Sequence, residues 1–299
     1  MIVGLLNGIL AMISFKNKRV RDVGCSLYIL GSSMTTLITM IMFGLKFWIL
    51  ILAQMAFIVN RSFLSFQCYS IDFLLQICLN MNQWLNAFVA IERAIMILKG
   101  TRFSKRKSKQ IAKLAIIILL IFIIGTTIHD PIYRRLIEED EENDNEKRIW
   151  CIVTYPLSLE TFNSFIQIFH VCVPFIINLI SIVILIKRKT RQQSTLQTHR
   201  TYKQILQEQF RQHRHLFLAS VILVILTLLR LIISLASKCM QSVNDSWLFL
   251  IGYFISFIPP MLTFVIFILS SKFYKKEFHK SIVQYRTNVQ RRLHLILQR

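Results

Sequence analysis

The segment from Cys68 to Leu98, CYSIDFLLQICLNMNQWLNAFVAIERAIMIL, decides the fold class. A membrane-crossing helix needs about twenty mostly apolar residues at about 1.5 Å each, and this segment exceeds that length. Its charged residues are Asp72 near one end and the pair Glu92-Arg93 near the other. The segment therefore predicts a transmembrane helix with charge near each membrane boundary.

The composition of the whole chain is also that of a membrane protein. Of 299 residues, 54% are hydrophobic and only 15 are acidic. Runs such as Leu114–Ile128 and Trp247–Ser271 carry no charge at all. The net charge of +21 lies between such runs, as membrane topology requires, so we predict a lipid bilayer and no nucleic acid as partner.

Seven apolar segments predict an all-α bundle of seven transmembrane helices. The first, Ile2–Phe15, is only about fourteen residues long, and we interpret it as a truncated first helix. The other six cover approximately residues 23–48, 68–98, 112–128, 161–186, 215–237 and 247–270. Between them, residues 49–66 are ambiguous, residues 130–155 read as an acidic loop, and residues 187–214 read as helix ends projecting into water.

A short amphipathic eighth helix is expected after the last span. Tyr274, Phe278 and Ile282 recur at every fourth residue among lysines, which is typical of a helix on a membrane surface. We expect one membrane domain over residues 1–283 and a basic cytoplasmic tail over residues 284–299.

Lys and Arg are concentrated in alternate connections. The segments after the first, third and fifth spans and the C-terminal tail carry most of them. Basic segments stay in the cytoplasm, so we predict a multi-pass plasma-membrane protein with its N-terminus extracellular and its C-terminus cytoplasmic. Asn60 and Asn244 then begin sequons on the extracellular side and are candidate N-glycosylation sites.

Four features of the sequence carry a family resemblance. Arg93 follows Cys68 by twenty-five positions within Glu92-Arg93-Ala94, Asn7 lies in the first apolar segment, Pro174 in the fifth, and Thr263–Phe267 near the end of the seventh. In these features the chain resembles a rhodopsin-like (class A) G-protein-coupled receptor, of the invertebrate peptide-receptor type. Glu92-Arg93-Ala94 then occupies the place of the family's Asp-Arg-Tyr motif, Asn7 and Pro174 match its first-helix asparagine and fifth-helix proline, and Thr263–Phe267 resembles its Asn-Pro-x-x-Tyr motif.

The resemblance implies several roles. Cys68 would form a disulfide with Cys151, the alternative being two unrelated thiols. Glu92 would partner Arg93, which would be released on activation to meet a heterotrimeric G protein. The alternative for this pair is an ordinary interfacial ion pair.

The sequence also departs from the family pattern. Thr263-Phe264 replaces Asn-Pro, and the sixth helix lacks its usual Trp and Pro. Ser32–Thr36 stands where the second helix usually carries an Asp, so no sodium site is expected. These departures affect the expected switch geometry and leave the topology unchanged.

Asp72, Gln76 and Arg230 are the candidate ligand-pocket residues. Asp72 and Arg230 lie in apolar runs near the outer boundary, where they would line a pocket or pair with each other. Alternatively, Arg230 reaches the lipid headgroups and Asp72 satisfies a loop. The position of the family's amine-binding Asp is Leu75 here, which disfavours a monoamine ligand.

A peptide is the ligand class that we expect. Seven of the fifteen acidic residues lie within residues 138–146, which suggests a cationic ligand such as a basic amidated neuropeptide. The alternative is that this run of charge is merely solvated.

Other functions find less support in the sequence. No phosphate-binding loop, nucleophile–base pair or HExxH motif indicates an enzyme, and the six cysteines form no CxxC pair, so neither metal nor cofactor is expected. A transporter or channel remains an alternative because of the amides on the third helix, although no internal repeat is visible. A truncated, non-signalling receptor copy is the other alternative.

Overall fold

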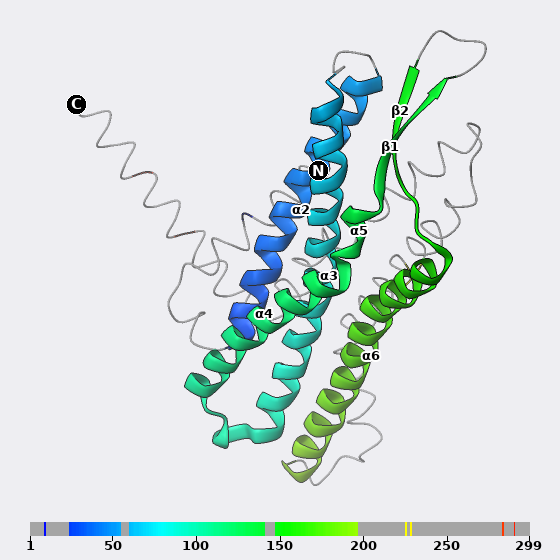
Figure 1. Cartoon of the computed structure of the whole chain (residues 1–299). Helices are drawn as coiled ribbons and strands as arrows, with labels where there is room; N and C mark the ends of the chain where they lie inside the picture. Colours follow the sequence, from blue (N-terminus) through cyan, green and yellow to red (C-terminus); the bar gives the residue numbers. More distant parts are fainter. Residues whose placement is uncertain are drawn as a thin grey trace.

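The computed structural model describes residues 24–54, 60–140 and 147–196, together with Ile9, Ile225, Leu228, Val283 and Gln290. The described elements follow in the order α2 (Gly24–Gln54), α3 (Arg61–Lys99), η2 (Gly100–Arg102), α4 (Lys105–Thr127), α5 (His129–Ile132), β1 (Arg134–Asp140), β2 (Lys147–Val153) and α6 (Leu157–Leu196) (Figure 1). Four of these helices, α2, α3, α4 and α6, are long and apolar enough to cross a membrane.

The four predicted spans that fall on described residues are all helical. The ambiguous region 49–66 contributes to two helices, because α2 continues to Gln54 and α3 begins at Arg61. The sixth and seventh spans and the eighth helix lie outside the continuously described residues, as does the first span apart from Ile9.

The ends of α3 are set by local backbone chemistry. Asn60 caps the N-terminus, where its Oδ1 accepts hydrogen bonds from the backbone N–H of Ser62 at 3.1 Å and of Phe63 at 3.3 Å. Gly100 ends the helix with a φ of +50°, a conformation that favours glycine. The helix is therefore longer at its start than the predicted span, which began at Cys68.

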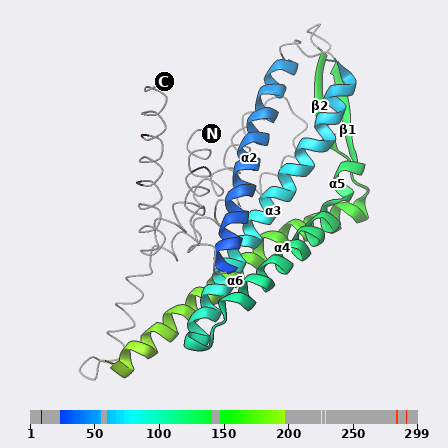
Figure 2. The same ribbon diagram turned by 90° about the vertical axis from the view of Figure 1, so that its left-hand side faces the viewer.

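Helix α3 is the centre of the described bundle and packs against α2, α4 and α6. Figure 2, turned by 90°, also shows α3 alongside α2 and crossing α4. The main core cluster joins Tyr28 of α2, Trp84 and Leu85 of α3, and Leu119 and Ile123 of α4. Large apolar side chains elsewhere on α4 are exposed, as expected of a surface that faces lipid.

A chain of polar side chains joins three helices inside this core. Trp84 Nε1 on α3 donates a hydrogen bond to His170 Nδ1 on α6 at 2.9 Å, and His170 Nε2 lies 2.9 Å from Thr126 Oγ1 on α4. Since the indole can only donate, Nδ1 accepts, and the neutral ring carries its hydrogen on Nε2. Thr126 can then donate to the carbonyl of Ile123, so each polar group in the chain has a partner.

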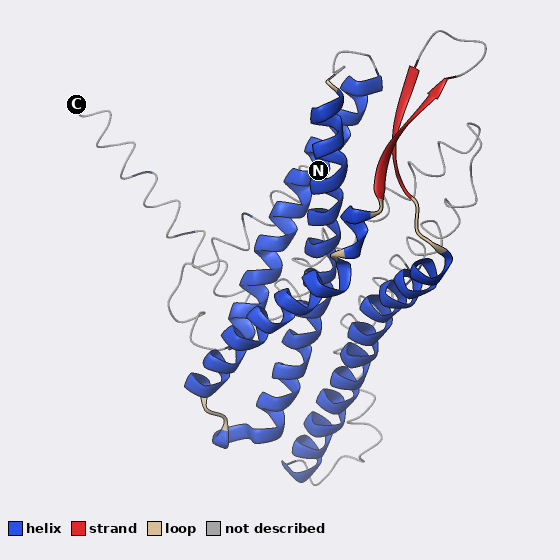
Figure 3. Ribbon diagram, in the orientation of Figure 1, coloured by secondary structure: helices blue, strands red, loops and turns tan. Residues whose placement is uncertain are grey.

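The acidic connection is a β-hairpin and not the plain loop that we expected. Strands β1 and β2 pair antiparallel, with Arg134 opposite Val153 and Asp140 opposite Lys147 (Figure 3). Branched and aromatic residues in the sequence Arg148–Val153 favour a strand, and the register places acidic positions of β1 opposite basic positions of β2. Figure 3 shows the hairpin beyond the end of α4, and we call this the hairpin end of the bundle.

Candidate functional site

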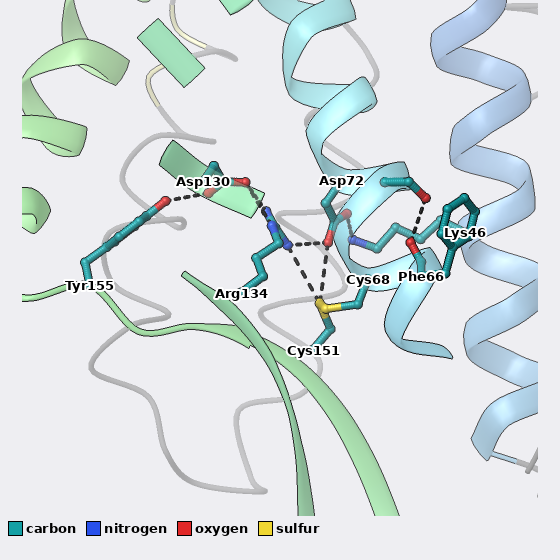
Figure 4. A network of polar contacts seen from close by, with 9 residues as sticks. Lys46, Phe66, Cys68, Asp72, Asp130, Arg134, Cys151 and Tyr155 are labelled. Carbon is teal, nitrogen blue, oxygen red and sulfur yellow. Dashed lines mark hydrogen bonds and ion pairs between the residues drawn. A yellow bond between two sulfur atoms is a disulfide. The ribbon is translucent and has the colours of Figure 1, made fainter. Parts of the chain in front are cut away.

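A network of charged side chains connects α2, α3 and the base of the hairpin (Figure 4). Asp72 on α3 forms ion pairs with Lys46 of α2 and with Arg134 of β1, whose Nη1 lies 2.5 Å from Asp72 Oδ2. The side chains of all three residues are largely buried, and that of Asp72 is only 12% exposed. The carboxylate of Asp72 is thus already neutralised by two cations of the protein itself.

The network continues from Arg134 toward α5 and the start of α6. Arg134 Nε donates to Asp130 Oδ2 at 2.8 Å, and the Tyr155 hydroxyl donates to Asp130 Oδ1 at 2.5 Å. Burial acts to lower the pKa of Arg134, but the neighbouring Asp72 and Asp130 outweigh it and raise the pKa. Burial and the hydrogen bond to Asp130 raise the pKa of Tyr155, so its hydroxyl keeps its proton and remains a donor.

A disulfide fixes the hairpin beside this network. Cys68 of α3 is bonded to Cys151 of β2, with a Cα–Cα distance of 5.8 Å, and Arg134 Nη1 lies 3.8 Å from Cys151 Sγ. The disulfide expected from the resemblance is confirmed. Covalent and ionic links therefore attach both strands of the hairpin to one turn of α3.

The sequence prediction identified Asp72 but only part of its surroundings. Arg230, its candidate partner, lies outside the described residues, and Gln76 is half-buried one turn further along α3. Leu75, at the position of the amine-binding Asp, is buried against Met40 and Phe43 of α2. These contacts place Leu75 in a helix–helix interface.

Four residues of the network did not appear among the predicted site residues: Lys46, Asp130, Arg134 and Tyr155. A local signal existed for one contact, since Asp130 and Arg134 are four residues apart. In the sequence, Lys46 is only a charged residue near the end of the predicted span 23–48. Neither signal indicates Asp72, which is 26 positions from Lys46 and 62 from Arg134.

Of the two predicted glycosylation sites, the structure describes Asn60. Asn60 is exposed at the hairpin end of α3 and serves as its N-cap through Oδ1. Asn244 lies outside the described residues.

A second polar site lies at the opposite end of the bundle, around Glu92. The Ser108 hydroxyl of α4 donates to Glu92 Oε1 of α3 and accepts the backbone N–H of Gly24 of α2 at 3.1 Å. Glu92 is buried, and its Oε2 accepts no hydrogen bond from any described residue. One hydroxyl therefore joins the ends of three helices.

Glu92 does not form the expected ion pair with Arg93 in the described structure. Consecutive residues on a helix point about 100° apart, so the two side chains do not face each other. Glu92 instead points toward the first turn of α4, where the positive end of the helix dipole favours a carboxylate. Arg93 is half-buried on the neighbouring face of α3.

Within the segment Ser32–Thr36, Ser32, Ser33 and Thr36 are buried, whereas Met34 is exposed. Ser32 Oγ lies 2.5 Å from Asn82 Oδ1 and 3.1 Å from Asn86 Oδ1, and all three residues are buried. The described members of this cluster are hydroxyls and amides. They provide no carboxylate where the second helix of the family usually has one.

Two comparisons bear on the identity of the chain. A search of curated proteins finds no match. The family model described as 7 transmembrane receptor (rhodopsin family) matches residues 6–280, which is most of the sequence and includes α2, α3, α4, α6 and the hairpin. The protein is therefore a multi-pass membrane protein with a seven-helix bundle, and it belongs to the rhodopsin family of G-protein-coupled receptors.

Proposed function

We propose that this receptor resides in the plasma membrane and transmits the binding of a basic extracellular peptide to a heterotrimeric G protein. The hairpin end would face the outside and the Glu92 end the cytoplasm, in agreement with the distribution of Lys and Arg. Binding would shift the bundle between two states that differ in affinity for the G protein.

The charge of the hairpin carries the proposal of a basic ligand. Residues 138–148 contain seven acidic and two basic residues, a net charge of minus five. The register places Glu139 opposite Arg148 and Asp140 opposite Lys147. Both basic positions therefore lie opposite acidic positions of β1, and the other acids of the segment have no basic position opposite them. A peptide that carries several positive charges would be attracted to this acidic surplus.

The ion pairs of Asp72 support the same assignment by a different route. Because Lys46 and Arg134 already neutralise this carboxylate, a small cationic ligand would have to displace a buried partner to reach it. The acids of the hairpin require no such exchange. A ligand that meets the hairpin first is therefore favoured over a small amine bound deep in the helices.

A screen of basic amidated peptides, read as intracellular calcium and cAMP in transfected cells, tests the proposal. An Arg93→Ala variant with equal surface expression serves as the signalling control, since the family resemblance assigns G-protein contact to Arg93. We expect a peptide agonist on the wild type and no response from the control. Silence across the peptides at full surface expression would contradict the proposal.

The contribution of the hairpin is tested with any agonist so found. Glu141, Glu142, Asp144 and Glu146 are replaced by their amides, two at a time and then together. Potency should fall stepwise, and the loss should shrink as salt is added because screening weakens the attraction. A potency that does not change with all four acids neutralised would leave the hairpin as a solvated charged segment.

A further inference from the structure

His129 of α5 joins the charge network of the hairpin end to α6. The residue is half-buried, and its Nε2 lies 3.2 Å from Oδ1 of Asn163, a residue of α6 that is 3% exposed. Its ring also contacts the rings of Tyr155 and Phe162, with a centroid distance of 5.7 Å to each. With Asn163 Oδ1 as the acceptor, Nε2 carries the hydrogen of the neutral imidazole, and Nδ1 is the nitrogen that can take up a proton.

Tyr155 links this imidazole to the ion pairs of α3. Its ring contacts His129, and its hydroxyl donates to Asp130 Oδ1 at 2.5 Å. The other oxygen of Asp130 accepts from Arg134, which pairs with Asp72 (Figure 4). A positive charge on His129 would therefore lie beside the residues that fasten the hairpin to α3.

The charged groups around His129 belong to three elements. Asp130 is its neighbour in α5, Arg134 begins β1, and Glu160 lies one turn before Asn163 on α6. Between pH 5 and 8 an imidazole ordinarily changes its charge, whereas carboxylates, tyrosine hydroxyls and guanidinium groups ordinarily do not. The two cations and two carboxylates of the network balance each other, so protonation of His129 would change the net charge there from zero to plus one.

The other histidines are less suited to respond to extracellular protons. The chain has seven histidines, of which the structure describes His129 and His170. His170 is 1% exposed, and both of its ring nitrogens contact side chains of neighbouring helices. The remaining five lie in segments, or at the start of a span, that the distribution of Lys and Arg assigns to the cytoplasmic side: His199, His213, His215, His279 and His294.

We propose that His129 binds a proton from the extracellular side, and that this protonation weakens the binding of a cationic ligand at the hairpin. An imidazolium fits this place, because two aromatic rings lie within cation–π distance and Asn163 Oδ1 accepts a charge-assisted hydrogen bond. The added charge would repel a basic peptide that approaches the acidic surplus of the hairpin. The cationic ligand and the extracellular placement rest on the function proposed above.

NMR of the purified full-length receptor, labelled with ¹³C in its histidine rings, tests the proton site directly. The signal that disappears in His129→Gln belongs to His129, and we expect it to shift between pH 8 and pH 5. His279→Gln is the matched control, which should remove a different signal and leave that of His129 in place. A His129 signal that does not move over this range would overturn the proposal. The measurement needs no agonist and no G protein.

The effect on a cationic ligand is measured with an N-acetylated, amidated hexa-arginine peptide, which has no group that titrates in this range. Its affinity for the receptor in phosphatidylcholine nanodiscs is compared at pH 7.8 and pH 5.8. We expect acid to weaken binding about threefold for the wild type and for His279→Gln, the size expected of one added charge about 10 Å away. His129→Gln should change by less than about 1.5-fold, because its side chain stays neutral.

His129→Arg carries a permanent charge and should bind the peptide at both pH values as weakly as the acidified wild type. An acid effect that persists in His129→Gln, or tight binding by a folded His129→Arg at pH 7.8, would overturn the proposal. Failure of the wild type to bind hexa-arginine at either pH, with a His129 signal that titrates, would contradict the cationic ligand and retain the proton site. A peptide agonist together with a fixed His129 signal would contradict only the proton site.

Discussion

Glu92 on α3 accepts a hydrogen bond from Ser108 on α4, sixteen positions further along the chain. The bond satisfies one oxygen of a buried carboxyl whose other oxygen has no donor among the described residues. Ser108 also accepts from Gly24 of α2, so its hydroxyl holds together the three helix ends beside Arg93.

Ser108→Ala should destabilise the receptor by about 2 kcal/mol, because it removes the donor to a buried carboxyl group. The loss is read as a lower melting temperature of the purified protein. Ser108→Thr keeps the hydroxyl and should melt within a few degrees of the wild type. Equal melting of the Ala variant and the wild type would show that Glu92 does not depend on this bond.

Gly24→Ala should disrupt the same site by steric overlap. A Cβ at this position would lie 2.6 Å from Ser108 Oγ and 2.8 Å from the Ser108 backbone oxygen, so a side-chain rotation alone cannot relieve the clash. Gly125→Ala on α4 is the control, since nothing lies within 4 Å of its added Cβ. We expect lower yield and melting temperature for Gly24→Ala, and no loss for Gly125→Ala, where alanine favours the helix by up to about 1 kcal/mol. Similar results for both would contradict the close contact.

Trp84 and His170 should be energetically coupled. Trp84→Phe leaves His170 Nδ1 without a donor, and His170→Phe leaves the indole N–H without an acceptor. In a double-mutant cycle of thermal stability, we expect a coupling of about 1 kcal/mol, near the values found for hydrogen bonds between membrane helices. Losses that simply add would mean that the observed bond contributes nothing to holding α6 against α3.

Asp72→Asn should cost about 3 kcal/mol of stability, because it leaves two largely buried cations without their shared carboxylate. Adding Lys46→Gln should recover part of this loss by removing one of those cations. Arg135→Gln, on the exposed neighbour of Arg134, should change stability by no more than about 0.5 kcal/mol. If the effects of Asp72→Asn and Lys46→Gln were additive, the two residues would not form a functional pair.

Asn60 allows glycosylation and helix capping to be separated. Asn60→Asp and Ser62→Ala both abolish the sequon but keep an oxygen that can cap α3, whereas Asn60→Ala removes both functions. In an Asn244→Gln background, glycosidase should reduce the mass of the parent protein but of none of the three variants. Of the three variants, only Asn60→Ala should be less stable than the parent protein because of the lost cap, by about 1 kcal/mol. A parent protein without glycan would refute glycosylation at Asn60.

The sequence by itself determined the membrane class and the four spans that the structure describes. These follow from hydropathy and from motifs within one segment, such as the spacing of Cys68 and Arg93, which folding does not alter. The boundary between α2 and α3 was less clear, because residues 49–59 are almost entirely apolar and the cap at Asn60 is a local backbone effect. The hairpin was missed because its run of acids obscured the short strands that flank it.

Only the tertiary structure decided which polar groups meet. Asp72 pairs with Lys46 and Arg134, and Glu92 bonds to Ser108 and not to its neighbour Arg93. Such contacts depend on how far each helix is rotated about its axis and on where a connection crosses the bundle. Those quantities are set by the packing of the whole core around α3, whereas hydropathy along one segment shows only that the segment is buried in the membrane.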